Sequence, residues 1–125
     1  MLLAFSIAFK FCEAQTKDSN TDTLLVGTWK GTSICQLKNS PCHDEVVVYR
    51  ITKKSSPNTY SIDARKVVNG IEEEMGILTF VYVETSHQLT SSDYGTWTFN
   101  VEAARLEGTL VHRGDLYRII KLVKQ

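Results

Sequence analysis

Hydrophobic and polar residues alternate with a period of two along most of the chain after Leu24. This alternation is typical of half-buried β-strands, and no longer stretch has the apolar face of a helix. Turn-forming residues interrupt it at intervals of about 8–12 residues, a spacing typical of an all-β barrel or sandwich. The predicted strands are residues 25–35, 45–52, 60–68, 71–83, 87–91, 94–101, 105–112 and 116–124.

The connections between the predicted strands are short, so strands that are neighbours in sequence should pair as antiparallel neighbours in one sheet. Asn69-Gly70 is the clearest turn, because this dipeptide favours a two-residue hairpin. An up-and-down sheet leaves two exposed edges unless its first and last strands also pair. We therefore predict an all-β fold, an eight-stranded antiparallel up-and-down β-barrel over residues 24–125.

The register of the hairpin around Asn69-Gly70 follows from its two-residue turn. It predicts four facing pairs, which are Val68–Ile71, Lys66–Glu73, Arg65–Glu74 and Ile62–Ile77. Opposite charges that face each other across two strands contribute roughly 0.2–1 kcal/mol each. We therefore interpret the acidic run at residues 72–74 as cross-strand partners of basic residues, with an acidic metal or ligand site as the alternative.

The N-terminal residues differ in character from the rest of the chain. Residues 1–9 are apolar, and Ala14 is a small residue of the kind that precedes a cleavage site. This outline predicts a secretory signal peptide over residues 1–15, followed by a polar linker over residues 16–23. It would place the protein outside the cytoplasm, either secreted or periplasmic. The alternatives are a buried N-terminal strand or helix and a lipoprotein anchor at Cys12.

The use of cysteine agrees with an oxidising compartment. Removal of the leader takes Cys12 with it and leaves one pair, Cys35 and Cys42, which we expect to form a disulfide. On the chain-entropy model such a short loop contributes roughly 2–3 kcal/mol. The alternative is a metal site, which requires closer spacing and further ligands, whereas only His43 is near.

Composition and motifs narrow the functional classes. Fourteen Lys+Arg and fourteen Asp+Glu give a formal charge of zero, so the basic footprint of a nucleic-acid-binding protein is absent. No apolar run reaches the roughly 18–20 residues of a membrane span. The chain has neither a nucleophile elbow nor a glycine-rich phosphate cradle. We therefore expect a monomer without a cofactor, without enzymatic activity and without catalytic residues.

The tripeptide Gly27-Thr28-Trp29 on the first predicted strand resembles the G-x-W signature of the lipocalins and their calycin relatives. The resemblance implies that Gly27 and Trp29 belong to the closed end of the barrel. It also implies that an arginine of the last strand, here Arg118, covers the indole. Because Arg118 lies near the start of its strand, Lys121 and Lys124 are the alternatives for this place.

The resemblance further implies a function, which is non-catalytic binding of a small, largely apolar molecule at the mouth opposite Trp29. The chain looks most like the compact secreted lipocalin-like proteins of bacteria. Strand direction places four loops at the mouth, at residues 36–44, 69–70, 92–94 and 113–115. Small inward residues on one strand face aromatic residues on another. This arrangement either leaves room for a ligand or lets the side chains interdigitate and fill the barrel. The candidate ligand-binding residues are Ser33, His43, Tyr94, Phe99 and His112.

Other functions remain as alternatives. The first is a protein-binding module, such as a secreted inhibitor or an envelope-associated partner, whose barrel is solidly packed. The small inward residues favour a cavity instead; they are Gly31, Ser33, Gly95 and Gly108. The second follows from residues 27–31, which are similar to nitrobindin-type haem barrels and would make His112 the iron ligand. We assign no metal site, because the histidines are not closely spaced.

Overall fold

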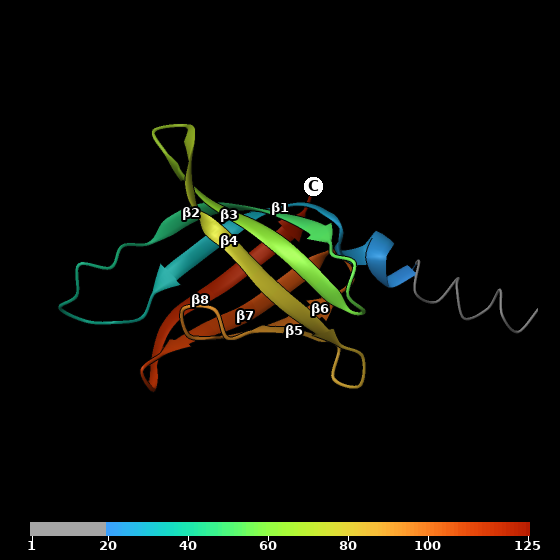
Figure 1. The fold of residues 1–125 in the computed structure, drawn as a ribbon. Coiled ribbons are helices and arrows are strands. Elements are labelled where there is room, and N and C mark those ends of the chain that lie inside the picture. The colour runs from blue at the N-terminus through green and yellow to red at the C-terminus, as the bar shows by residue number, and fades with distance from the viewer. Residues whose placement is uncertain (1–19) are drawn as a thin grey trace, which may run out of the picture.

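The computed structural model describes residues 20–125, so the predicted signal peptide lies outside the described residues. Eight strands form one closed barrel, in which each strand pairs with its neighbours in sequence and the first strand also pairs with the last (Figure 1). This confirms the predicted eight-stranded antiparallel up-and-down barrel. The strands are β1 (Gly27–Cys35), β2 (Glu45–Lys53), β3 (Thr59–Val68), β4 (Ile71–Val83), β5 (Gln88–Ser91), β6 (Thr96–Glu102), β7 (Arg105–His112) and β8 (Asp115–Lys124).

The two ends of the barrel carry different segments. The loop after β1, the β3–β4 turn, the β5–β6 loop and the β7–β8 turn all lie on the left in Figure 1. The helical turn before β1 and the C-terminus lie towards the other end. We call the end with the four loops the mouth and the other end the closed end. The mouth loops are the segments expected from strand direction.

A short helical turn lies at the closed end. Residues 20–25 are helical, where the sequence predicts the end of a linker and the start of a strand. The side chain of Leu25 is fully buried, and its carbonyl oxygen accepts a hydrogen bond of 2.9 Å from Trp29 Nε1. Lys124 Nζ donates to the carbonyl oxygens of Thr23 and Leu24, at 2.6 and 3.0 Å. These last carbonyls have no partner within a helix, so Lys124 caps the turn and ties it to β8.

The interior of the barrel is filled by large side chains from all eight strands. Tyr49 and Phe99 meet edge to face with ring centroids 6.5 Å apart. Phe80 packs against both Trp97 and Phe99, at 6.0 and 5.7 Å. Edge-to-face and tilted contacts at these distances are the favourable arrangements for aromatic pairs. The centre of the barrel is therefore an aromatic core.

Two inward glycines mark places where strands approach each other closely. A Cβ atom at Gly31 would lie 1.7 Å from the carbonyl oxygen of Lys121. A Cβ atom at Gly108 would lie 2.0 Å from the carbonyl oxygen of Thr98 and 2.8 Å from the ring of Phe99. The space beside both residues is thus occupied by backbone and an aromatic ring. The inference that these glycines favour a cavity was wrong.

The outer half of the β3–β4 hairpin has the predicted register. Lys66 faces Glu73, and Arg65 faces Glu74. Arg65 Nη2 lies 3.0 Å from the carboxylate of Glu74. The predicted register is therefore confirmed for both charged pairs, and an ion pair is formed by Arg65 and Glu74.

The inner half of the hairpin departs from the prediction by one residue. Ile62 faces Leu78 and not Ile77, because Met75 is an additional residue on β4 and forms a β-bulge. Gly76, which follows it, has a φ of 140°. This conformation is readily accessible to glycine and strained for other residues.

Candidate ligand site at the barrel mouth

The wall of the barrel is incomplete between β4 and β5. Strand β4 pairs with β3 along its length but with β5 only over Val81–Val83. Just past β5, Asp93 Oδ2 accepts a hydrogen bond of 2.8 Å from the backbone N–H of Thr79. From Ile71 to Leu78, no strand among the described residues pairs with this side of β4. A gap therefore separates the outer half of β4 from the β5–β6 loop.

A hollow of about 170 Å³ lies at this gap. Its lining combines residues of the barrel interior with residues of the two edges of the gap. The lining residues are Tyr49, Ala64, Met75, Gly76, Leu78, Tyr94 and Trp97. All of them except Gly76 present an aromatic, aliphatic or thioether side chain, so the hollow suits an apolar group.

Tyr94 forms the outer wall of the hollow. Its side chain is 79% exposed, and its φ of 61° lies in the left-handed region. A bulky residue rarely adopts this conformation, and strain of this kind tends to occur at binding sites. Two hydrogen bonds fix the loop, one of 2.6 Å from Trp97 Nε1 to the carbonyl of Asp93 and one of 3.2 Å between His112 Nδ1 and the carbonyl of Tyr94. The loop therefore holds an exposed aromatic ring beside the hollow.

Tyr49 lines the hollow and carries a phenol hydroxyl group. Burial raises the pKa of its phenol well above the ordinary value, and the negative charge of Glu45 raises this pKa further. The phenol is therefore protonated at neutral pH and remains a hydrogen-bond donor. Within the described residues, no hydrogen bond involves this hydroxyl group.

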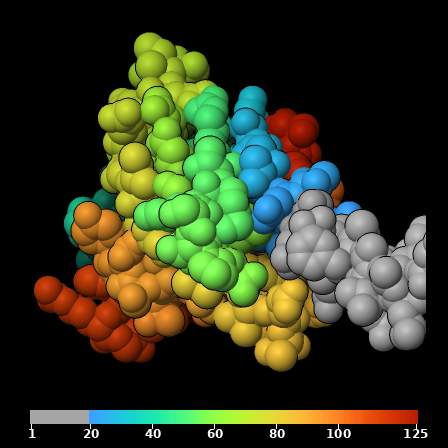
Figure 2. All heavy atoms as spheres, turned by 45° about the vertical axis from the view of Figure 1, so that its right-hand side comes forward, coloured from blue at the N-terminus to red at the C-terminus, as the bar shows by residue number. Residues whose placement is uncertain are grey.

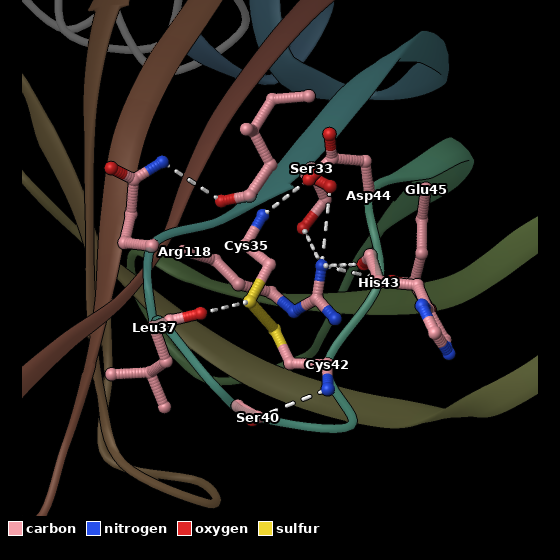
Figure 3. The surroundings of a disulfide bond; sticks show 11 residues. Ser33, Cys35, Leu37, Ser40, Cys42, His43, Asp44, Glu45 and Arg118 are labelled. Atoms are coloured by element: carbon pink, nitrogen blue, oxygen red, sulfur yellow. Dashed lines mark hydrogen bonds and ion pairs between the residues drawn. A yellow bond between two sulfur atoms is a disulfide. The ribbon is translucent and has the colours of Figure 1, made fainter.

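Arg118 lies beneath the 36–44 loop at the mouth, as Figure 3 shows. Its Nη1 donates to the backbone oxygen and Oγ of Ser33, at 3.1 and 3.2 Å, and to the backbone oxygen of His43 at 3.0 Å. The carboxylate of Glu45 is 3.4 Å away. This guanidinium is therefore engaged by the protein itself, and it joins β1 and the loop to β8.

The expectation that Arg118 covers Trp29 is therefore wrong. Strand β8 begins at the mouth, so Arg118 pairs with Cys35 while Trp29 pairs with Lys124. Lys124 Nζ lies 5.9 Å from the centroid of the Trp29 ring, within the range of a cation–π interaction. Lys124 thus takes the place that the sequence offered to Arg118, Lys121 or Lys124.

The predicted disulfide between Cys35 and Cys42 is present, with the two Cα atoms 5.9 Å apart (Figure 3). The backbone N–H of Cys35 donates to Asp44 Oδ1 at 2.9 Å. The backbone N–H of Cys42 donates to Ser40 Oγ at 3.2 Å. Together with Arg118, these bonds fix both ends of the loop at the mouth.

The structure separates the five candidate ligand-binding residues. Tyr94 lines the hollow and, with His112, also lines a neighbouring depression of about 420 Å³ among the loop tips. His43 lines another depression, of about 520 Å³, between the 36–44 loop and the β3–β4 hairpin. Ser33 is buried against Arg118, and Phe99 is buried in the aromatic core, so neither lines the hollow.

Sequence reasoning did not single out the other residues of the hollow. Alternation along the predicted strands does place Tyr49 and Trp97 inward, and this signal was available. Met75 and Gly76 reach the hollow only because of the β-bulge, which alternation does not reveal.

The described part of the chain does not contain a set of residues suited to bind a metal ion or haem. Within residues 20–125, no three His, Cys, Asp or Glu side chains come together in an arrangement that could hold a metal ion. His112 is exposed, with its ring 6.2 Å from that of Tyr117. It lies among the loop tips and not in a large enclosed apolar pocket, so it does not fit the haem interpretation. No helix of the described residues has the length and apolar character to cross a bilayer.

Comparison with known proteins identifies the fold of the chain but not its function. No protein-family model and no curated protein matches the chain. Among solved structures, the chain is similar to one described as "The Siderocalin Ex-FABP functions through dual ligand specificities". The TM-score is 0.54, with 11% sequence identity over 80% of this chain and 69% of that chain. From this likeness and the closed antiparallel barrel with its G-x-W strand, we conclude that the chain has a lipocalin-like calycin fold.

Proposed function

We propose that this protein binds a small, largely apolar molecule in the hollow between β4 and the β5–β6 loop, without catalysis. The observation that carries the proposal is the lining of the hollow, where Tyr49, Leu78 and Trp97 meet the exposed ring of Tyr94 at the mouth of a lipocalin-like barrel. Apolar clefts with few polar groups are the usual form of a small-molecule site.

The volume of the hollow limits what enters it. Pockets for drug-sized ligands span roughly 300–1,000 Å³, whereas this hollow measures about 170 Å³. An apolar cavity of roughly 150 Å³ accommodates benzene. The group that enters is therefore a single ring or a short acyl chain, and the rest of a larger ligand would lie against Tyr94 outside.

The polar groups around the hollow define a second feature of the ligand. Arg118 Nη1 is engaged by Ser33, His43 and Glu45, and Arg118 does not line the hollow. The Tyr49 hydroxyl is a protonated donor with no partner among the described residues. A ligand oxygen that accepts from Tyr49 would therefore fix the orientation of the apolar group.

Secretion or export to the periplasm is part of the same proposal. The Cys35–Cys42 disulfide supports it, because disulfides persist mainly in oxidising compartments. In such a compartment the fixed 36–44 loop would also lower the cost of ordering the mouth when a ligand binds.

Two measurements test the proposal. Native mass spectrometry of the disulfide-bonded protein from its own export route should show a mass above that of the bare polypeptide. Titration of ligand-free protein with benzyl alcohol and with hexanoic acid should change the fluorescence of Trp97, which lines the hollow. Tyr49→Phe should weaken binding about three- to tenfold, the value of one hydrogen bond.

The matched controls use one residue inside the hollow and one outside it. Ala64→Phe should abolish the response because it fills the floor, whereas Val123→Phe on the exposed face of β8 should leave it unchanged. An equal response in wild type and Ala64→Phe, or none in wild type, would contradict the proposal.

The second candidate function is a protein-binding module with a packed barrel. The observation that favours it is the filled interior, in which Phe80, Phe99 and the two close-packed glycines occupy the space inside the barrel. If this second candidate is right, the outer surface of the barrel would bind the partner protein.

A further inference from the structure

The most exposed large apolar side chains lie beside the gap in the barrel wall. Tyr94, Ile77 and Ile71 are 79%, 70% and 68% exposed, the highest values among the large hydrophobic residues described. Ile71 and Ile77 belong to the part of β4 that has no neighbour on its β5 side. The tip of the hairpin that carries them forms the top of the molecule in Figure 2.

This part of β4 is an open sheet edge. Its backbone N–H and C=O groups on the β5 side meet no strand among the described residues, and only Thr79 is satisfied there, by the side chain of Asp93. Open edges bind further strands, which supply the missing hydrogen bonds. The hydrocarbon of a bilayer cannot supply them. The edge therefore favours a polypeptide partner over a lipid surface.

The charge around this edge selects the kind of polypeptide. Five carboxylates and four basic groups lie there, an excess of one negative charge. The carboxylates are Asp63, Glu72, Glu73, Glu74 and Asp93, and the basic groups are Lys30, Arg50, Arg65 and Lys66. A second copy of this edge would bring the same negative charge and a second bulge against the first. A basic segment is complementary.

We propose that the β4 edge from Ile71 to Leu78 is the docking site of an extended, basic segment of another protein, which adds to β4 as a further strand. Its aliphatic side chains cover Ile77 on the outer face, and its basic side chains, which alternate to the opposite face, lie near Glu73. The inference is independent of a small-molecule ligand, because it rests on the open edge and its charge.

The test uses a blocked peptide of about eight residues with alternating Lys and Val. The probe is titrated into the ¹⁵N-labelled, disulfide-bonded protein. Backbone amide signals of β4 between Ile71 and Leu78 should shift, and their hydrogen exchange should slow. The corresponding Glu–Val peptide should bind at least about tenfold more weakly because of its charge. A Lys–Val peptide with alternate N-methyl groups should also bind at least about tenfold more weakly, because it cannot form the ladder of backbone hydrogen bonds with β4.

Two variants localise the interaction. Ile77→Lys removes the exposed aliphatic side chain and adds a like charge, so it should weaken binding of the Lys–Val peptide at least about tenfold. Val123→Lys makes the same change on the exposed face of β8 and should have no effect. Unchanged ¹⁵N signals elsewhere in the spectrum verify that each variant is folded.

Several outcomes would overturn the inference. These are no binding of the Lys–Val peptide, equal binding of the Glu–Val or N-methylated peptide, and an equal effect of both variants. Flotation of the protein with phosphatidylcholine vesicles, in the absence of peptide binding, would assign the edge to a lipid surface instead. The benzyl alcohol titration reports on Trp97, whereas the peptide titration reports on the backbone amides of β4. Failure of small-molecule binding can therefore be distinguished from failure of peptide docking.

Discussion

Gly31 and Gly108 show how closely the strands of this barrel approach one another. Each would place a Cβ atom within 2.0 Å of a carbonyl oxygen on the next strand. Neither backbone oxygen can move without shifting its strand. Overpacking of this kind costs roughly 1–3 kcal/mol.

We expect Gly108→Ala to lower the free energy of unfolding by about 1–3 kcal/mol, measured by urea denaturation. Thr32→Ala, at an exposed position of β1, should stay within about 0.5 kcal/mol of wild type. If Gly108→Ala were as stable as wild type, the close contact with Thr98 would not be a constraint on the barrel.

The same two glycines show how much a sequence reveals about a single residue. Alternation identifies their inward direction, because side chains on a strand point alternately to its two faces. The distance to the next strand depends on how far the strands of the closed barrel are staggered, and no local pattern contains this. The role of Arg118 was missed for a related reason, since its partners Ser33 and His43 are 85 and 75 residues away in sequence.

The β3–β4 hairpin is held to the outside of the barrel by an ion pair that reaches across β3. Arg50 on β2 donates to both carboxylate oxygens of Glu72 on β4, at 2.6 and 3.0 Å. The hydrogen-bonded pair with Arg50 lowers the pKa of Glu72 below its ordinary value of 4.5, and the charges of Arg65 and Lys30 add to this. Bidentate pairs of this type also fix geometry.

The lowered pKa of Glu72 determines how the ion pair affects stability with pH. A carboxyl group whose pKa is lower in the folded than in the unfolded state stabilises the fold above the unfolded value, and this contribution is lost as pH falls through the folded value. Glu72→Gln should therefore lower the urea midpoint at pH 7. The difference from wild type should vanish at a pH well below 4.5. A difference that persists in acid would show that the hairpin is held by something other than the charge of Glu72.

At the scale of elements, the sequence predicted all eight strands and their order. It missed the helical turn at residues 20–25, because Leu25 continues the alternation of the inward positions of β1. The contacts of that turn are also distant in sequence, as with Lys124 and the hydrogen bond from Tyr60 to Asp22. It also missed the bulge at Met75, since a strand pattern records alternation but not the point at which pairing shifts.

For the molecule as a whole, Trp29 joins the helical turn to the barrel. Its indole is fully buried, donates to Leu25 and is approached by Lys124. We expect Trp29→Ala to lower the free energy of unfolding by about 3–5 kcal/mol. Val26→Ala, at an exposed neighbour, is the control. An unchanged denaturation midpoint for Trp29→Ala would show that this end does not depend on the indole.

The position of the candidate site could be predicted at this scale, but its residues could not. The direction of β1 away from Trp29 determines which loops lie at the mouth, and the hollow is found there. Its shape depends on the early end of β5, on the bulge in β4 and on the left-handed conformation of Tyr94. Each of these is a departure from regular strand geometry, which periodicity does not describe.

The pairing of β1 with β8 has a consequence for biosynthesis. Every hydrogen bond across this seam joins the first strand to the last, and the contact of Lys124 with Thr23 spans 101 residues. Contacts of such high sequence separation slow folding. While the chain emerges from the ribosome, or crosses a membrane in unfolded form, β1 has only one neighbour until residues 115–124 arrive. The other edge of β1 therefore stays open to pairing with other chains until the last strand is available to close the barrel.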